Sequence, residues 1–218
     1  MNFRQVLSWA VALLVPVALV LTSVRLMMNP LFLQFEYNQA SFPADPFGFT
    51  KEDRLHWSGI DLDYLLNSAG ISFLGDLRFD NGQPVYNERE LRHMVDVKNA
   101  VKGALTVWVA SLVLLLGLGL LAWGLGWLDA LRAGLVRGGW LTLLLLGAIL
   151  LFVLFGFGVF FVGFHEVLFP AGSWTFEYSD TLIRLFPERF WRDVFTIVAI
   201  LPLAGGLALI LGLRRGRL

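Results

Sequence analysis

Four long runs of the sequence contain no formally charged side chain: residues 5–24, 103–128, 138–164 and 194–213. These runs contain 20, 26, 27 and 20 residues. A helix needs about 20 apolar residues to cross the hydrocarbon core of a bilayer, so each run is long enough to span it. We therefore predict four transmembrane helices, at about 5–27, 100–126, 139–163 and 194–213.

The first run has the position of a signal peptide but differs from one in two respects. It is longer than a usual signal-peptide hydrophobic region, and no clear small-x-small cleavage site follows it. We therefore predict that it is an uncleaved membrane anchor, so that residues 1–218 form a single integral membrane domain.

Residues 28–98 and 164–193 are predicted to be the two polar segments outside the membrane. In the longer one, "NP", "FPADPFGF" and "DNGQP" are typical of turns. The aromatic pattern of "FLQFEY" favours a short strand, and "DLDYLLNSAG" favours a short helix that ends at Gly70. The predicted fold class is an all-α polytopic membrane protein with a compact extracytoplasmic segment between helices one and two.

Composition agrees with a membrane location. The chain has 57% hydrophobic residues and a mean hydropathy of +0.69, too apolar for an ordinary soluble domain. Its formal net charge is zero, so nothing points to a nucleic-acid partner. The absence of cysteine excludes disulfides, thiolate nucleophiles and cysteine metal ligands.

Charge placement predicts the orientation. The two termini and the connection at 129–137 contain a single acid, Asp129, and six basic residues: Arg4, Arg132, Arg137, Arg214, Arg215 and Arg217. The other 16 of the 17 acids lie in the two opposite segments. Because positive charge accumulates on the cytoplasmic side, we predict cytoplasmic termini and polar segments on the outer face of the plasma membrane.

Two of the three histidines stand at edges of apolar runs. His93 precedes the second run and His165 follows the third. If these runs form antiparallel helices with a turn near 124–134, each histidine lies about 31 residues from the turn, and both reach the same level at 1.5 Å per residue. A turn at 129–139 would instead place His93 about ten residues further out.

A pair of histidines at the membrane surface suggests proton-transfer chemistry. The pKa of an unperturbed histidine lies closest to neutrality, so the side chain can take and return a proton. Glu90 and Asp96 are three residues before and after His93, where a helix would let either one fix its tautomer, and Glu166 adjoins His165.

Other interpretations of the histidines remain open. Interfacial histidines also occur simply as tolerated amphipathic residues, and His56 in "RLHWSG" is expected in a surface loop. "HEVLF" begins like a zinc-protease helix, but Phe169 stands where the second histidine would be. A zinc site would have to come from residues without diagnostic spacing: His93, His165, Asp96 and Glu166. A non-catalytic membrane assembly factor and a zinc-dependent membrane hydrolase are therefore the alternative functions.

Two blocks, "ELRHMVDVK" (90–98) and "FHEVLFPAGSWTFEYSDTLIRLFPERFW" (164–191), resemble the lipoprotein intramolecular transacylases of bacteria, the Lit family. The matching residues of the first block are Glu90, His93, Met94, Asp96, Val97 and Lys98. Those of the second are Phe164, His165, Trp174, Phe176, Leu182, Ile183 and Pro187. The resemblance extends over most of the chain from about Asp61, where "DLDYLLN" begins, and the region 30–60 matches no pattern of the family.

The resemblance implies an acyltransferase that acts on a diacylglyceryl-modified lipoprotein within the membrane lipids. An acyl chain would move from the glyceryl sn-2 oxygen to the α-amine of the N-terminal cysteine, giving a lyso-form lipoprotein without a cofactor or metal. His165 would be the base, and His93 would have the acid or electrostatic role. The residues expected to bind substrate or orient the site are Glu90, Asp96, Lys98, Trp174 and Tyr64.

Overall fold

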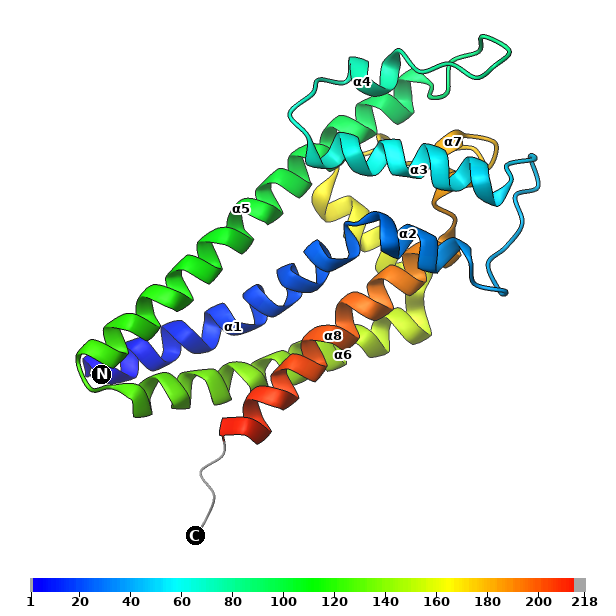
Figure 1. The fold of residues 1–218 in the computed structure, drawn as a ribbon. Helices are drawn as coiled ribbons and strands as arrows, with labels where there is room; N and C mark the ends of the chain where they lie inside the picture. Colours follow the sequence, from blue (N-terminus) through cyan, green and yellow to red (C-terminus); the bar gives the residue numbers. More distant parts are fainter. Residues whose placement is uncertain (1, 214–218) are drawn as a thin grey trace. The chain divides into compact units, whose positions relative to one another are not determined.

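The computed structural model describes residues 2–213, and Arg214, Arg215 and Arg217, used above for the orientation, lie outside that range. Within it the chain forms eight helices (Figure 1): α1 (Phe3–Met27), α2 (Pro30–Tyr37), α3 (Lys51–Leu66), α4 (Ser72–Gly75), α5 (Glu88–Gly124), α6 (Leu128–Leu168), α7 (Thr181–Leu185) and α8 (Glu188–Leu213). No strand forms in this range, where β pairing is limited to an isolated bridge between Arg78 and Pro84.

The predicted fold class is confirmed. Four helices in residues 2–213 are long and apolar enough to cross a membrane, namely α1, α5, α6 and α8. Each contains one of the predicted apolar spans almost entirely, because backbone groups in hydrocarbon have to be paired within the segment and a helix achieves this. α5 ends at Gly124 and α6 begins at Leu128, so the turn between them lies close to the first of the two predicted positions.

Contacts divide the chain into two compact units. Of the described residues, the first unit comprises 2–26, 104–156 and 195–213, and the second comprises Met27–Gly103 and Phe157–Val194. Within α6, the division coincides with Gly156, whose φ of −138° and ψ of 37° are not helical and mark a kink.

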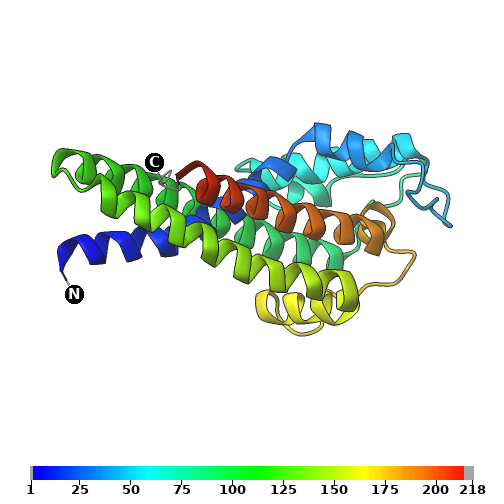
Figure 2. The same ribbon diagram turned by 90° about the horizontal axis from the view of Figure 1, so that it is seen from below.

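In the first unit, the apolar parts of α1, α5, α6 and α8 run alongside one another (Figure 1 and Figure 2). α6 approaches its neighbours through glycines that leave no room for a side chain. A Cβ atom at Gly138 would lie 2.5 Å from Cβ of Val15 in α1, and one at Gly139 would lie 2.7 Å from the carbonyl oxygen of Gly206 in α8. Such close approach of backbones favours helix association in lipid, where no hydrophobic effect drives it.

Polar side chains of the first unit add interhelical hydrogen bonds. Trp108 Nε1 of α5 donates to Thr22 Oγ1 of α1 over 3.0 Å, and Arg137 Nη1 of α6 donates to Ser8 Oγ over 2.9 Å. Each hydrogen bond of this kind stabilises the association of two transmembrane helices by about 0.6–2 kcal/mol.

The second unit is organised around α3, which contacts α2, α4 and α7. Its core is a cluster of buried side chains: Tyr64, Leu74, Val85, Tyr86, Met94, Leu182 and Leu185. α3 begins with a capping box, in which Thr50 and Asp53 each pair with the other's backbone N–H. The buried guanidinium of Arg54 donates to the carbonyls of Arg184 and Pro43, so α3 also fixes the chain around α7.

Three local predictions differ from the structure. The strand expected over "FLQFEY" is wrong, because the side chain of Asn29 caps the segment and Pro30 occupies the first turn, which makes it α2. The helix expected over "DLDYLLNSAG" begins ten residues earlier, at Lys51, and is capped by Asn67 rather than ended by Gly70. His56 is exposed, as predicted, but lies within α3 and not in a loop.

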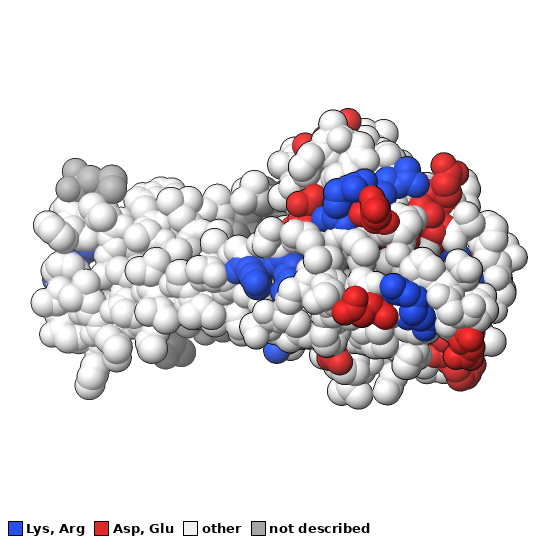
Figure 3. Space-filling view, turned by 90° about the horizontal axis from the view of Figure 1, so that it is seen from above, with Lys and Arg blue, Asp and Glu red and all other residues white. Residues whose placement is uncertain are grey.

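Charge is distributed unequally between the two units. On the face shown in Figure 3, most of the charged side chains lie over the second unit, and the surface of the first unit is nearly free of charge. The exposed residues of α5 and α6 in the first unit include many large apolar side chains, among them Leu114, Leu116, Leu144 and Phe155. An apolar exterior of this kind suits contact with acyl chains rather than water.

Candidate active site

The rings of His93 and His165 are stacked in the second unit. Their centroids are 6.2 Å apart and their planes differ by 23°. His93 lies in the first turns of α5, and His165 lies in the last turn of α6. Both side chains are buried, each with 8% of its surface exposed. The structure thus brings together the two histidines that the sequence places about seventy residues apart.

Aromatic side chains surround the pair. Phe169 contacts both rings, with centroids 4.9 Å from His93 and 5.5 Å from His165. Phe176 lies 5.3 Å from His93, and Trp174 lies 5.0 Å from His165. Sequence reasoning missed Phe169 as a site residue and noted it only as an obstacle to a zinc motif. Its place one helical turn after His165 could have indicated the contact.

A backbone carbonyl sets the tautomer of His165. Nδ1 lies 2.7 Å from the carbonyl oxygen of Phe161, one turn earlier in α6. Because a carbonyl only accepts, Nδ1 has to carry the hydrogen, and the neutral ring then has its lone pair at Nε2. His165 is therefore arranged to accept a proton at Nε2, which is what a general base requires.

Three buried nitrogen atoms at or beside the site lack partners among the described residues. They are Nδ1 of His93, Nε1 of Trp174 and Nε of Arg89, whose guanidinium lies over Phe176. A buried polar atom without a partner costs about 1–3 kcal/mol. Such atoms are rare in folded proteins and therefore call for an explanation.

Glu90 does not orient His93, although helical spacing made that arrangement possible. Its carboxylate accepts from the backbone N–H groups of Asn87 and Leu182, both over 2.8 Å. Leu182 is the second residue of α7, so a fully buried carboxylate attaches the start of α7 to the start of α5. Glu90 thus fixes one end of the segment that contains Trp174 and Phe176, at Leu182.

A second set of bonds fastens the same segment. Arg89 Nη2 pairs with Asp180 Oδ2 at 3.2 Å, and Asn87 donates to the other oxygen of Asp180. Thr181 donates its hydroxyl to the carbonyl of Val85. These contacts join the start of α7, at Asp180 and Thr181, to the start of α5 and the residues just before it.

The other predicted site residues lie apart from the two imidazoles. Lys98 donates to Asn67 Oδ1 over 3.1 Å and to the carbonyl of Ala69 over 2.7 Å. Its ammonium group also lies 3.8 Å above the ring of the buried Tyr64, a cation–π contact. These two residues thus join α5 to the end of α3. No hydrogen bond or ion pair of Asp96 occurs in residues 2–213.

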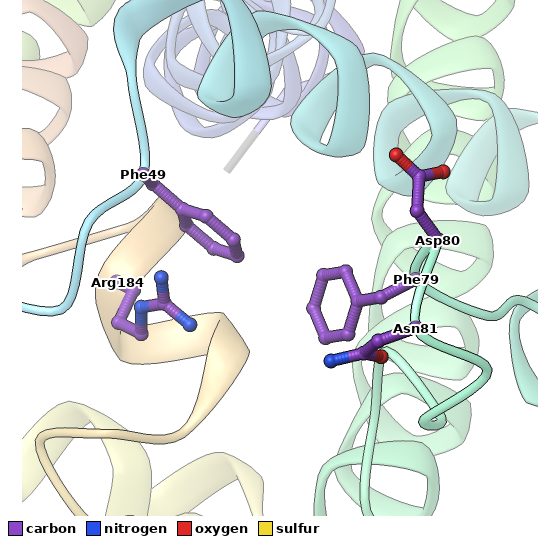
Figure 4. A pocket seen from close by; sticks show the side chains of 5 residues that line it. All are labelled: Phe49, Phe79, Asp80, Asn81 and Arg184. Atoms are coloured by element: carbon purple, nitrogen blue, oxygen red, sulfur yellow. The ribbon is translucent and has the colours of Figure 1, made fainter.

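A cavity in the second unit is separate from the histidines. It measures about 420 Å³ and is lined by Phe49, Phe79, Asp80, Asn81 and Arg184. Figure 4 shows the rings of Phe49 and Phe79 facing the gap from opposite sides, and their centroids are 6.1 Å apart. Arg184 is engaged by Asp45 at 2.9 Å, and the pKa of Asp45 lies below its ordinary value because bonds from Phe49 N–H and Arg184 outweigh its burial.

The predicted zinc alternative finds no geometric support. In the part of the chain that the structure describes, no three histidine, aspartate or glutamate side chains converge as metal ligands would. Glu166, one of the residues considered for such a site, is exposed on the last turn of α6.

The fold and the histidine pair define a class: a polytopic helical membrane protein with a buried pair of imidazoles at the ends of two of its long helices. The family model of "Lipoprotein intramolecular transacylase Lit" matches residues 9–191. The chain belongs to the Lit family, as the resemblance of its two sequence blocks indicated.

Relatives of known sequence or structure extend over nearly the whole chain. An uncharacterized protein of Aquifex aeolicus (strain VF5) is 33% identical over 211 residues, which cover 94% of this chain and 91% of that one. The membrane integral lipoprotein intramolecular transacylase Lit of Bacillus cereus superposes with a TM-score of 0.73 at 19% identity, covering 94% of this chain and 92% of that one. The structure of a variant of that protein with a histidine-to-arginine mutation superposes with a TM-score of 0.74 at 18% identity, covering 97% of this chain and 90% of that one.

Proposed function

We propose that this chain catalyses an intramolecular O-to-N acyl transfer on a diacylglyceryl-modified lipoprotein. The acyl chain leaves the sn-2 oxygen of the glyceryl group and forms an amide with the α-amine of the N-terminal cysteine. The product is an N-acyl, S-monoacylglyceryl lipoprotein. Membership of the Lit family supports this proposal, and the observation that carries it is the buried pair of stacked imidazoles at 6.2 Å.

The reaction needs little beyond positioning and proton transfer. An ester is converted to a more stable amide, so no nucleotide or activated donor is required. Because amine and ester belong to one substrate molecule, their effective concentration is already high once they are oriented. The remaining barrier is attack by a neutral amine and departure of an alkoxide, and both steps require movement of a proton.

The geometry favours His165 as the base. Its Nδ1–H is held by the carbonyl of Phe161, which leaves Nε2 to take a proton from the attacking α-amine. The C–N bond forms as the tetrahedral intermediate appears, and the bond from carbon to the sn-2 oxygen then breaks. His93 has the acid or electrostatic role at the departing oxygen, and the proton lost by the amine ends on the glyceryl hydroxyl.

The aromatic surroundings of the pair fit an acylated substrate. The rings that contact the two histidines belong to Phe161, Phe164, Phe169, Trp174 and Phe176. These side chains exclude water from the imidazoles, which limits hydrolysis of the ester as a competing reaction. The substrate would enter from the bilayer with its ester and amine at the depth of the pair.

Substrate and product of this reaction are isomers, which determines the test. The N-terminal peptide of a reporter lipoprotein should be isolated from bacteria that lack such an enzyme, with and without this chain. Its mass should stay the same, while tandem mass spectrometry shows one acyl group moved onto the amine. An unchanged fragmentation pattern, or a mass gain of one acyl group, would contradict the proposal.

A further inference from the structure

The indole N–H of Trp174 is a buried hydrogen-bond donor without an acceptor in residues 2–213. An indole N–H can only donate and does not lose its proton near neutral pH. When tryptophan is buried, this group usually finds a partner. An unpaired donor of this kind therefore indicates an acceptor that belongs to a bound molecule.

The indole ring of Trp174 lies beside one of the two imidazoles of the proposed reaction centre. The indole ring lies 5.0 Å from the ring of His165, tilted by 38°. Phe176, two residues further along the same segment, contacts His93 at 5.3 Å. One short stretch of chain thus reaches both imidazoles, with the indole next to the one whose Nε2 is free to act as the base.

The chemistry of the proposed acyl transfer requires a donor at this point. Attack of the amine converts the ester carbonyl oxygen into an oxyanion, whose charge is costly in an apolar site. His165 cannot serve it with Nδ1–H, because that hydrogen is held by the carbonyl of Phe161. Arg89 also has a buried donor without a partner in residues 2–213, its Nε–H, but its Nη2 is held by Asp180 and its guanidinium lies over Phe176, at 5.8 Å from the centre of that ring, rather than over either imidazole.

We propose that the indole N–H of Trp174 is the oxyanion donor of this enzyme, hydrogen-bonded to the former ester carbonyl oxygen in the tetrahedral intermediate. This role rests on the proposed acyl transfer. It makes Trp174 a catalytic residue, and it leaves His93 to act at the departing glyceryl oxygen.

The sharpest test removes the N–H and keeps the shape of the ring. Replacing Trp174 by β-(3-benzothienyl)alanine substitutes sulfur for the indole nitrogen. Loss of one oxyanion donor typically lowers kcat by about 10²–10³-fold. We expect a loss of this size with KM and the melting temperature unchanged, since the interaction forms only in the intermediate. Trp174→Phe should show a similar loss of kcat.

The matched control is the same replacement at Trp57. This residue packs against Phe79 and His56 in the second unit and has no ring contact with His93 or His165. The activity of the enzyme with this replacement at position 57 should stay within a factor of two of the wild-type activity. A kcat at wild-type level for the Trp174 replacement would overturn the proposal, as would a loss explained by a raised KM or a lowered melting temperature.

A second measurement does not depend on turnover. The enzyme labelled with ¹⁵N-tryptophan should bind a phosphonate analogue of the tetrahedral intermediate. The indole proton of Trp174 should then move downfield in the NMR spectrum, as expected for a hydrogen bond to an anionic oxygen. An unmoved signal with the analogue bound would refute the oxyanion role. If the wild-type enzyme showed no acyl transfer at all, the proposed function itself would be refuted.

Discussion

The carboxylate of Glu90 accepts a hydrogen bond of 2.8 Å from the backbone N–H of Leu182, and so attaches α7 to α5. The two residues are 92 positions apart in the chain. The carboxylate also meets Asn87 N–H, which leaves both of its oxygens occupied. The segment that covers the imidazoles is therefore held in place by a buried carboxyl group at the first turn of α7.

Removing this carboxylate should loosen the segment before it unfolds the protein. Hydrogen bonds to a charged group are worth about 1.5–3 kcal/mol each, and Glu90→Ala leaves the buried N–H of Leu182 and the part-buried N–H of Asn87 without this acceptor. We expect faster hydrogen exchange in peptides covering 173–186, a lower melting temperature and loss of acyl transfer. Glu90→Gln, which keeps an acceptor oxygen, should lie between this variant and wild type.

Glu88→Ala is the control for Glu90→Ala. Glu88 is also in the first turn of α5, but its side chain is 93% exposed and its pairing with Arg92 is at the surface. Surface pairs of this kind contribute at most about 1 kcal/mol. Equal exchange rates over 173–186 in Glu90→Ala and wild type would show that the attachment has no effect on the segment.

Each histidine of the pair should be essential to the proposed transfer. General acid–base catalysis is typically worth about 10²–10⁴-fold, so His93→Ala and His165→Ala should each abolish lyso-form product in an endpoint assay. The double variant should be little worse than either single one, because residues that act as a unit are not additive. Tandem mass spectrometry of a reporter lipoprotein provides the measurement.

His56→Ala serves as the control for both substitutions. His56 is exposed on α3 and its ring contact is with Trp57. The activity of His56→Ala should equal that of wild type. The melting temperatures of the histidine variants should all lie within a few degrees of the wild-type value. Full activity of either His93→Ala or His165→Ala would restore the interpretation of that residue as a tolerated interfacial side chain.

Buried acids should make stability fall as pH rises. Burial raises the pKa of Asp61 from 3.8 to about 8, with nearby Glu90 acting in the same direction and the hydroxyl of Tyr86 opposing it. The folded chain then holds a proton that the unfolded chain releases, so this contribution to stability is lost between about pH 4 and pH 8. Burial and Asp193 likewise raise the pKa of Glu36 to about 7.

Asp61→Asn should therefore reduce the fall in melting temperature between pH 5 and pH 9. The melting temperatures of the variant and of wild type are to be measured in detergent solution at both pH values. The neutral amide keeps the shape of the protonated acid. At high pH the free energy of unfolding of the variant should exceed that of wild type by a few kcal/mol at most, which corresponds to about one to two pKa units. Asp63→Asn, on the exposed side of the same helix, is the control. Parallel pH profiles for Asp61→Asn and wild type would contradict the assignment.

Orientation can be tested because the chain has no cysteine of its own. Ser68→Cys and Leu125→Cys both introduce exposed thiols, the first after α3 and the second in the turn between α5 and α6. The excess of basic residues near that turn predicts that it is cytoplasmic. An impermeant maleimide added to intact cells should label Cys at position 68 and not at 125. The reverse pattern would invert the topology.

The sequence allowed the helical membrane fold to be predicted because hydropathy is a local property. Each uncharged run is found almost entirely within one long helix of the structure. The error at α2 arose from giving the aromatic pattern more weight than the cap signals, since Asn29 and Pro30 announce a helix. The same short segment therefore contained both the misleading and the correct indication.

The candidate site was predictable in part. The histidine pair followed from matching the positions of His93 and His165 along two helices joined by a short turn. The place of Glu90 did not follow, because its partner Leu182 is in another part of the chain and the bond is to a backbone N–H. Spacing on one helix points only to neighbours on that helix, so His93 was the natural but incorrect choice. The orphaned nitrogen of Trp174 likewise depends on tertiary packing.

The glycines of α6 restrict how this membrane protein can change over evolutionary time. A methyl group at Gly138 would overlap Val15, and one at Gly134 would come within 2.6 Å of the carbonyl oxygen of Ser8. Any single replacement of Gly134 or Gly138 adds a side chain for which the facing helix α1 leaves no space. Substitutions at position 138 should therefore arise together with a smaller residue at position 15, so that the two positions exchange volume and vary as a pair among related sequences.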